Sequence, residues 1–298
     1  YNPDLLIRLK MNRDFFKDSK ILGIWTKISR ILGLIRDNMC GRMFGTSIEF
    51  GAFTIAFRVP DLLRRLLEEG ALSAVFIPPL VNSLEKEGRE KSIQFAATIL
   101  SITLITLSLI CVTALVIFFA ILQLAPINDE WRYVLKYSII LTPCLVFIGM
   151  TALLGSILNV LKNFFTTAFS PVLFNIIWIA GLITAWYCYQ TTHQRLTIVC
   201  LFLTISGVIQ VAVLLLVLRK NKWPLHFSFT KNSANISTIF KKILPVTFCL
   251  AIFQINILID SIIAIFLADS KHAVAALYYS DRIQQLPLGI FSLSIATA

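Results

Sequence analysis

Long apolar stretches with almost no charge constrain this chain more than any other feature. A helix needs about 20 mostly apolar residues to cross a hydrocarbon core roughly 30 Å thick, and segments of that length recur along the sequence. Only 14% of the 298 residues are charged and the mean hydropathy is +0.80, whereas soluble domains carry about a quarter charged residues. This composition disfavours a water-soluble globule and predicts an all-α polytopic membrane protein.

Hydropathy predicts eight membrane spans. They lie near residues 21–45, 49–84, 93–124, 133–160, 169–190, 196–218, 243–268 and 273–298. The second is long and charged for a simple span, and Pro60, Pro78 and Pro79 each remove a backbone donor, so we expect it to break. The last apolar run is still uninterrupted at Ala298, which leads us to expect a longer natural protein.

Basic residues are distributed unevenly between the connections. Segments 1–20, 85–92, 161–168 and 219–242 together hold fifteen Lys and Arg residues, and the alternate connections hold three, namely Arg132, Arg195 and Lys271. Cytoplasmic loops carry the excess of Lys and Arg. We therefore predict a cytoplasmic N-terminus, and we attribute the net charge of +11 to membrane topology rather than to nucleic-acid binding.

Cysteine and histidine give no sign of a metal site. All six cysteines lie within or at the ends of apolar segments without a C-x-x-C pair, and the three histidines, His193, His226 and His272, do not pair at ligand spacing. Free cysteines of this kind are usually small core residues. We expect no metal and no cofactor.

The segment 30–69 concentrates charge inside a membrane-like pattern. It holds Arg30, Arg36, Asp37, Arg42, Glu49, Arg58, Asp61, Arg64, Arg65, Glu68 and Glu69. A charge at the bilayer centre costs at least roughly 2.5–3.5 kcal/mol, so such residues normally face a partner or a water-filled cavity. The cluster therefore requires an explanation.

Pairing along the helix is one explanation. Asp61 and Arg65, Arg64 and Glu68, and Arg65 and Glu69 are each four residues apart, a spacing at which opposite charges neutralise each other on a helix. This reading and a functional one stay equally open for Arg58, Asp61 and Glu68. Arg42 fits interfacial snorkelling.

Arg30, Arg36 and Arg64 fit a binding cavity better, because only Asp37 is nearby to balance the first two. Guanidinium is a planar fork of donors that stays charged when buried and binds phosphate oxygens bidentately. An arginine-lined membrane cavity therefore indicates an anionic ligand, with phosphate favoured.

Four motifs resemble one family of transporters. They are SRILGLIRD (29–37), MFG (43–45), AFRVPDLLRRLLEEGALSAVFIPPL (56–80) and YYSDRIQQLP (278–287). They are similar to MurJ, also called MviN, the lipid II flippase branch of the multidrug/oligosaccharidyl-lipid/polysaccharide exporter (MOP) superfamily. The PDLLRR…EGALS segment is the most specific part of the resemblance.

The resemblance implies a fold of two six-helix lobes followed by two further helices. It divides this chain into a cytoplasmic segment (1–20), a first lobe (21–218), a cytoplasmic loop (219–242) and the start of a second lobe (243–298). It also implies a flippase of the bacterial inner membrane that moves undecaprenyl-pyrophosphate-linked disaccharide pentapeptide by alternating access. The implied partners are lipid II, membrane lipids and the cell-wall synthesis machinery.

Matching motif to motif implies which residues hold the substrate. The central-cavity arginines become Arg30, Arg36, Arg64 and Arg282, with Ser29, Arg65 and Glu69 beside them. Two positions depart from the family pattern: Gly51 stands where an acidic residue is usual after the MFG turn, and Gln285 stands where glutamate is frequent.

Asp260 is a lone carboxylate in the predicted seventh span. Intramembrane acids are functional candidates by default, and the resemblance suggests sodium or proton coupling here. The alternative is a protonated structural carboxyl group, because burial raises carboxyl pKa values.

Two other function classes fit the sequence less well. A cation-coupled multidrug exporter of the same superfamily calls for an apolar or acidic cavity. A membrane enzyme acting on polyprenyl phosphates calls for paired carboxylates, histidine clusters or a metal site on cytoplasmic loops.

Overall fold

The computed structural model describes the chain except for residues 1–2, 69–70, 226–255, 257–258, 261–262, 264–271 and 297–298, and except for the side chains of residues 3–21, 65–66, 68, 71–74 and 285–296. The described part is helical. Its helices are α1 (Pro3–Phe44), α2 (Ile48–Glu68), α3 (Ala71–Lys86), α4 (Arg89–Leu124), α5 (Asp129–Leu141), α6 (Cys144–Val160), α7 (Phe164–Cys188), α8 (Thr192–Lys220) and α10 (Ala273–Ala296).

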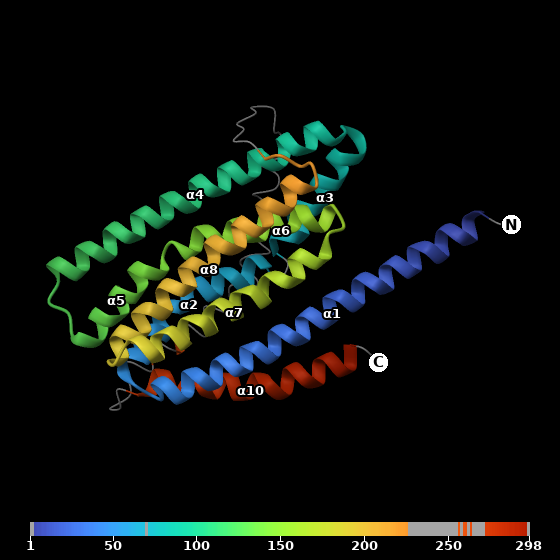
Figure 1. Cartoon of the computed structure of the whole chain (residues 1–298). Helices are drawn as coiled ribbons and strands as arrows, with labels where there is room; N and C mark the ends of the chain where they lie inside the picture. Colours follow the sequence, from blue (N-terminus) through green and yellow to red (C-terminus); the bar gives the residue numbers. More distant parts are fainter. Residues whose placement is uncertain are drawn as a thin grey trace.

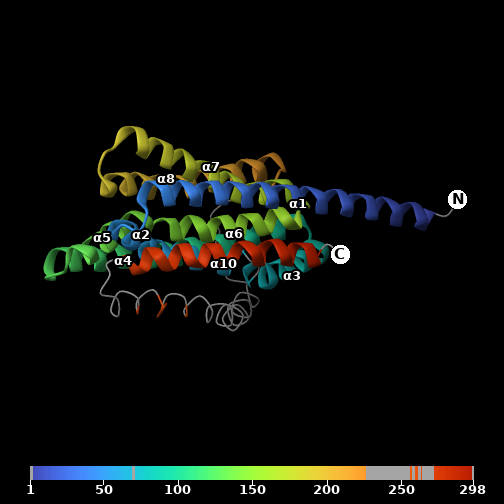
Figure 2. The same cartoon turned by 90° about the horizontal axis from the view of Figure 1, so that it is seen from below.

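The helices form an elongated bundle and run along its length (Figure 1). α4 lies along one side, α1 and α10 lie along the other, and the N-terminal part of α1 extends beyond the bundle (Figures 1 and 2). Among the described residues, α4, α7 and α8 are each long and apolar enough to cross a membrane. The pair α5 and α6, bent by 40°, forms a fourth span if it is counted as one broken helix.

One predicted span is interrupted within the described residues. Residues 69–70, between the end of α2 at Glu68 and the start of α3 at Ala71, are not described, so the break expected in the second span stays a prediction; all three prolines lie inside these two helices. The fourth span, expected to be continuous over 133–160, is broken between α5 and α6. Pro143 stands at this break and supplies no backbone N–H, and proline is the usual cause of a sharp helix kink.

The first helix is longer than hydropathy indicates. It begins at Pro3 rather than near residue 21, so most of the polar N-terminal segment is helical. α6 and α8 both end in the same way, with Lys162 and Lys222 at positive φ. Asn163 N then donates to Leu158 O and Trp223 N to Leu218 O, the six-to-one hydrogen bond of a Schellman cap.

Glycines bring the inner helices into close contact. A Cβ atom on Gly181 of α7 would lie 2.7 Å from Phe202 Cβ on α8, and one on Gly207 of α8 would lie 2.7 Å from Phe147 Cβ on α6. Small residues at such positions let backbones approach in membrane helices. α7 is thereby fixed against the bundle, and this matters because α7 supplies Asn175, Phe174 and Trp178, which contact the arginines of the site described below.

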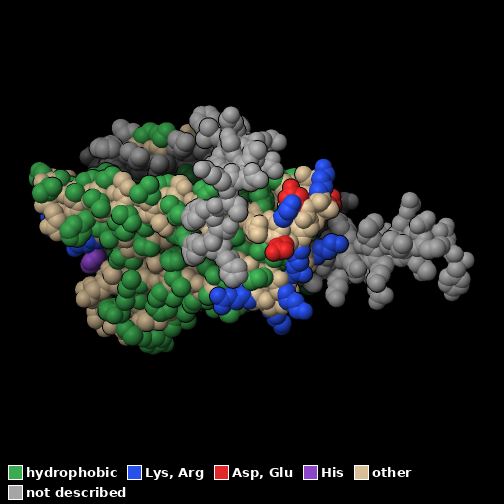
Figure 3. Space-filling model, turned by 90° about the horizontal axis from the view of Figure 1, so that it is seen from above, with side chains coloured by type: hydrophobic (Ala, Val, Ile, Leu, Met, Phe, Trp, Pro, Cys, Tyr) green, Lys and Arg blue, Asp and Glu red, His purple; other side chains and the backbone are tan. Residues whose placement is uncertain are grey.

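Two connections predicted on the same side of the membrane lie at the same end of the bundle. Arg89 Nη2 donates to the carbonyl oxygens of Asn221 at 2.6 Å and Lys222 at 2.8 Å, which joins the 85–92 segment to the end of α8. Charged side chains gather at one end of the face in Figure 3, next to a broad hydrophobic surface. The bundle therefore has the apolar belt and charged end of a membrane protein.

Four of the cysteines are buried as expected. Cys40, Cys111, Cys144 and Cys200 are free and buried, and Cys188 is free and exposed. Cys249 lies outside the described residues.

Candidate functional site

Among the predicted site arginines whose side chains are described, Arg36 is the most buried, with 7% of its surface exposed. Its Nε and Nη2 atoms donate to Asp37 Oδ1 at 2.9 and 2.7 Å. Its Nη1 atom donates to Asn175 Oδ1 at 2.9 Å, and the guanidinium lies 4.2 Å from the centre of the Trp178 ring. A carboxylate, an amide and an aromatic face thus offset the cost of burying this cation.

Asn175, in the middle of α7, joins this arginine to α1. Its Nδ2 atom lies 3.2 Å from both the carbonyl oxygen and the hydroxyl oxygen of Ser29 and can donate to either. Ser29 and Arg36, both predicted site residues, are therefore held by one amide. Asn175 is not among the site residues predicted from the sequence. Its one distinguishing feature there is that it is an asparagine within the apolar run 168–183.

Arg64 reaches the same face of α7 from α2. Its Nη2 atom lies 2.7 Å from Asp61 Oδ1, and its guanidinium lies 5.3 Å from the centre of the Phe174 ring. Phe174 and Trp178 pack edge to face at 5.6 Å and are four residues apart, on one side of the helix. The guanidinium groups of two arginines from different helices therefore lie over neighbouring aromatic rings of α7.

Arg282 brings α10 to the site through Asp37. Arg282 Nε lies 3.7 Å from Asp37 Oδ2, and the Tyr278 hydroxyl donates to Asp37 Oδ1 at 3.4 Å. The Arg282 guanidinium lies over the Tyr278 ring at 5.1 Å. Asp37 thus stands between Arg36 of α1 and Arg282 of α10.

Another ion pair joins α10 to α2. Arg58 Nη2 lies 3.4 Å from Asp281 Oδ2. Arg58 was left open between pairing and function, and it pairs with a residue 223 positions away rather than along its own helix. Arg64 pairs with Asp61, three residues before it; the predicted pairings four residues apart involve the side chains of Arg65, Glu68 and Glu69, which lie outside the described residues.

The other predicted site residues are Arg30, Arg65, Glu69 and Asp260. Arg30 is exposed on α1, directly after Ser29. The side chain of Arg65 and all of Glu69 lie outside the described residues. Asp260 is helical and exposed, with the residues around it largely undescribed.

The departure at Gly51 has a structural reason. A Cβ atom there would lie 3.6 Å from Val274 Cβ and 3.8 Å from the backbone nitrogen of Ala275. The position usually taken by an acid in the resembled family is therefore covered by the first turn of α10. The side chain of Gln285, the other departure, is not among those described.

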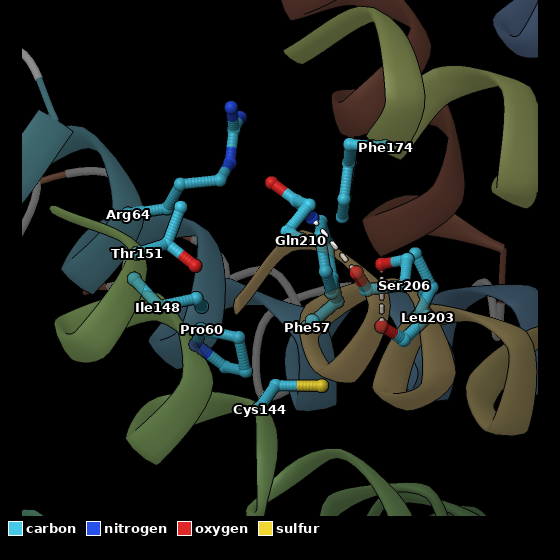
Figure 4. Close-up of a pocket in the computed structure, with 11 residues that line it drawn as sticks. Phe57, Pro60, Arg64, Cys144, Ile148, Thr151, Phe174, Leu203, Ser206 and Gln210 are labelled. Carbon is cyan, nitrogen blue, oxygen red and sulfur yellow. Dashed lines mark hydrogen bonds between the residues drawn. The ribbon is translucent and has the colours of Figure 1, made fainter. Parts of the chain in front are cut away.

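A pocket opens beside Arg64 (Figure 4). Figure 4 shows the Arg64 guanidinium extending away from Pro60 and Cys144, with Gln210 and Phe174 across the hollow. Gln210 is buried, donates to Ser206 O at 3.2 Å and accepts from Ser170 Oγ at 2.7 Å. The pocket combines one cation with aromatic and neutral polar groups.

The charges of this site favour an anion. Arg36, Arg64 and Arg282 face two carboxylates, Asp37 and Asp61, in the contacts above. A phosphate group could take the place of a carboxylate on these guanidinium groups, because its oxygens accept the same charge-assisted hydrogen bonds. In the described part of the chain, no three His, Cys, Asp or Glu residues come together to hold a metal ion.

Known proteins resemble this chain over nearly its whole length. The family model described as lipid II flippase MurJ matches residues 40–298. The "Probable lipid II flippase MurJ" of Rickettsia prowazekii (strain Madrid E) is 32% identical over 290 residues, which cover 95% of this chain and 55% of that protein. The "Lipid II flippase MurJ" of Burkholderia cenocepacia is 29% identical over 284 residues, covering 92% and 54%.

A solved structure has the same arrangement of helices. The structure named "Lipid II flippase MurJ, inward closed conformation" superposes with a TM-score of 0.71 at 23% identity, covering 91% of this chain and 55% of that one. The all-α fold predicted from the sequence, that of the corresponding part of MurJ, is thereby confirmed. The chain spans about half the length of the relatives that it matches, and it belongs to the lipid II flippase MurJ family.

Proposed function

We propose that this chain is the substrate-binding half of a flippase that moves lipid II, an undecaprenyl-pyrophosphate-linked peptidoglycan precursor, from the inner to the outer leaflet of the bacterial cytoplasmic membrane. The observation that carries the proposal is the pair of arginines, Arg36 and Arg64, seated on neighbouring rings of α7. The family and its printed function support the substrate class.

The binding step follows from the charges. The pyrophosphate of the substrate binds the guanidinium forks of Arg36, Arg64 and Arg282, with Arg30 beside them on α1. This anion competes with Asp37 and Asp61 for the same donors. The lipid tail stays in the bilayer, and the protein makes or breaks no covalent bond.

Replacement of Arg36 tests this binding role. We expect Arg36→Ala in the full-length protein to abolish growth when the native flippase of the cell is depleted, with unchanged membrane levels of the variant. Arg36→Lys should restore growth poorly, because lysine supplies charge without a bidentate fork. Arg42→Ala, which removes an exposed arginine on the same helix, is the matched control and should grow normally; full growth of Arg36→Ala would refute the assignment.

The orientation proposed from the basic residues places the N-terminus and the connections 85–92 and 219–242 in the cytoplasm. Single cysteines at 85–92 should react with a membrane-impermeant reagent only after the membrane is permeabilised, and cysteines near 128 and 193 should react in intact spheroplasts. The reverse pattern at Lys222→Cys would overturn the orientation.

Asp260 is proposed to couple transport to sodium or to protons, with its exposed position on a helical segment leaving it accessible to an ion. Flipping of lipid II in vesicles with imposed gradients compares the native protein with Asp260→Asn. If the variant keeps the native rate and the same dependence on sodium, pH and potential, Asp260 has no coupling role.

A further inference from the structure

A second pocket adjoins the one beside Arg64 and has a different lining. Its polar residues are Thr151, Ser156 and Asn159 of α6 with Thr167 and Ser170 of α7. Thr151 lines both pockets. The second pocket has a volume of about 160 Å³, smaller than the roughly 300–1,000 Å³ of a complete small-molecule site, so it can hold one part of a larger ligand.

The hydroxyl groups of this pocket present acceptors rather than donors. Thr151 Oγ1 donates its hydrogen to Phe147 O at 2.8 Å, and Thr167 Oγ1 lies 2.9 Å from Asn159 Oδ1. Ser170 Oγ donates to Gln210 Oε1 at 2.7 Å. A hydroxyl that has donated its one hydrogen keeps oxygen lone pairs for the pocket, while the side-chain NH2 group of Asn159 in the same lining is a donor, so the fitting ligand offers O–H or N–H donors together with an acceptor oxygen.

The charge around the pocket selects a neutral ligand. None of the lining residues that the structure describes carries a charge, while the guanidinium of Arg64 stands in the adjoining pocket. A bare cation would meet repulsion from Arg64 without a carboxylate in the described lining to offset it. Sugar hydroxyls and acylamino N–H groups supply donors without net charge.

The two pockets follow one face of α7. Thr167, Pro171, Phe174 and Trp178 are spaced by four, three and four residues, which keeps them on one side of a helix. The guanidinium of Arg64 lies over the Phe174 ring, and Thr167 lines the hydroxyl-rich pocket. Thr167 and Phe174 are seven positions apart, which is roughly 10 Å along the helix at 1.5 Å per residue, so one extended head group can reach both.

We propose that the pocket lined by Thr151, Thr167 and Ser170 is the carbohydrate subsite, which takes the sugar next to the pyrophosphate while the arginines hold the pyrophosphate itself. This assignment rests on the proposed function. It adds that the first lobe binds the neutral part of the head group as well as its charged part.

Two lipid probes separate the subsite from the anion site. Binding of undecaprenyl pyrophosphate and of the same lipid carrying the disaccharide pentapeptide is measured for the full-length protein in detergent. Thr167→Val should weaken binding of the glycosylated probe about 3- to 10-fold, the loss of one hydrogen bond, and should leave binding of the bare pyrophosphate probe unchanged. Thr151→Val, whose side chain lines both pockets, should weaken binding of the glycosylated probe more than binding of the bare one. Thr184→Val is the matched control, because Thr184 also donates to a backbone carbonyl of α7 but lies outside both pockets.

Gly155→Ala gives a variant that folds. Gly155 lines the pocket, and its added Cβ atom meets only Thr167 Cγ2, at an ordinary distance of 3.6 Å. Alanine is also the better helix former. We expect a melting temperature no lower than that of the native protein, with selectively weaker binding of the glycosylated probe.

The outcomes are distinguishable. Equal effects on both probes, or no effect on either, in the Thr151, Thr167 and Gly155 variants would overturn the carbohydrate subsite. Arg64→Ala should weaken both probes; if it weakens neither, the proposed anion site is wrong, and the hydroxyl variants still decide the subsite.

Discussion

The buried arginine Arg36 illustrates how single residues make a charged membrane site tolerable. Its donors reach a carboxylate and an amide, and its plane lies over an indole ring. Removal of one partner of a buried charge costs more than the pair itself contributes, because the other charge remains buried. Asn175 is the neutral partner, so its replacement tests the arrangement without a change in net charge.

We expect Asn175→Leu to weaken binding of undecaprenyl pyrophosphate about 10-fold or more. The variant leaves Arg36 Nη1 without its acceptor and Ser29 without its donor, and a hydrogen bond to a charged group contributes about 1.5–3 kcal/mol. The dissociation constant of the purified full-length protein is the measurement. Thr184→Val, on the same helix, controls for disturbance of α7, and native affinity in Asn175→Leu would show that Arg36 keeps its position without the amide.

At the level of elements, the position of α7 depends on its contact with α8. Gly181 faces Phe202 so closely that any side chain must displace it, and overpacking of a close-packed interior typically costs about 1–3 kcal/mol. Trp178, which carries Arg36, lies one turn before Gly181 on the same helix. The glycine therefore stabilises both the bundle and the site.

Gly181→Ala should destabilise the protein by about 1–3 kcal/mol. Gly33→Ala on α1 is the matched control, because nothing lies within 4 Å of its added Cβ atom, and there alanine should be neutral or stabilising by up to about 1 kcal/mol. Unfolding in detergent, followed by thermal or denaturant titration, compares the two. If both variants change the free energy of unfolding by the same amount, the close contact at Gly181 does not restrict the packing of α7 on α8.

On the scale of the whole molecule, α10 packs along one side of the bundle against α1 and α2 (Figure 1). A Cβ atom on Gly41 would lie 3.8 Å from the Tyr279 ring, and Phe50 stacks on Tyr279 at 5.3 Å. Two ion pairs, Asp37 with Arg282 and Arg58 with Asp281, continue this contact along the helices. The alternating access that the family resemblance implies would require this contact to separate.

A disulfide between Gly51→Cys and Val274→Cys should lock that contact. The Cβ atoms would lie 3.6 Å apart, inside the usual range of about 3.5–4.5 Å for a disulfide. In the full-length protein, oxidation should stop flipping of lipid II in vesicles, and a reductant should restore it. Each single variant, treated in the same way, controls for the other cysteines; continued flipping by the cross-linked protein would show that the two helices need not part.

The sequence by itself determined the class of the molecule and most of the charged site. Lipid tails cannot satisfy backbone polar groups or charges, so apolar length predicts spans, and arginines kept inside spans predict function. The motifs likewise predict Arg36, Arg64 and Arg282 as site residues without any knowledge of their contacts. These inferences depend on composition and local order, which the one-dimensional chain contains.

Only the tertiary structure decided which partners these residues take. Asn175, Phe174 and Trp178 look like ordinary members of an apolar run, and they join the site because α7 packs across α1 and α2. The pairing of Arg58 with Asp281 and the contact that covers Gly51 also join residues more than 200 positions apart. Such contacts depend on how helices cross in three dimensions, and helix spacing along the sequence does not specify that crossing.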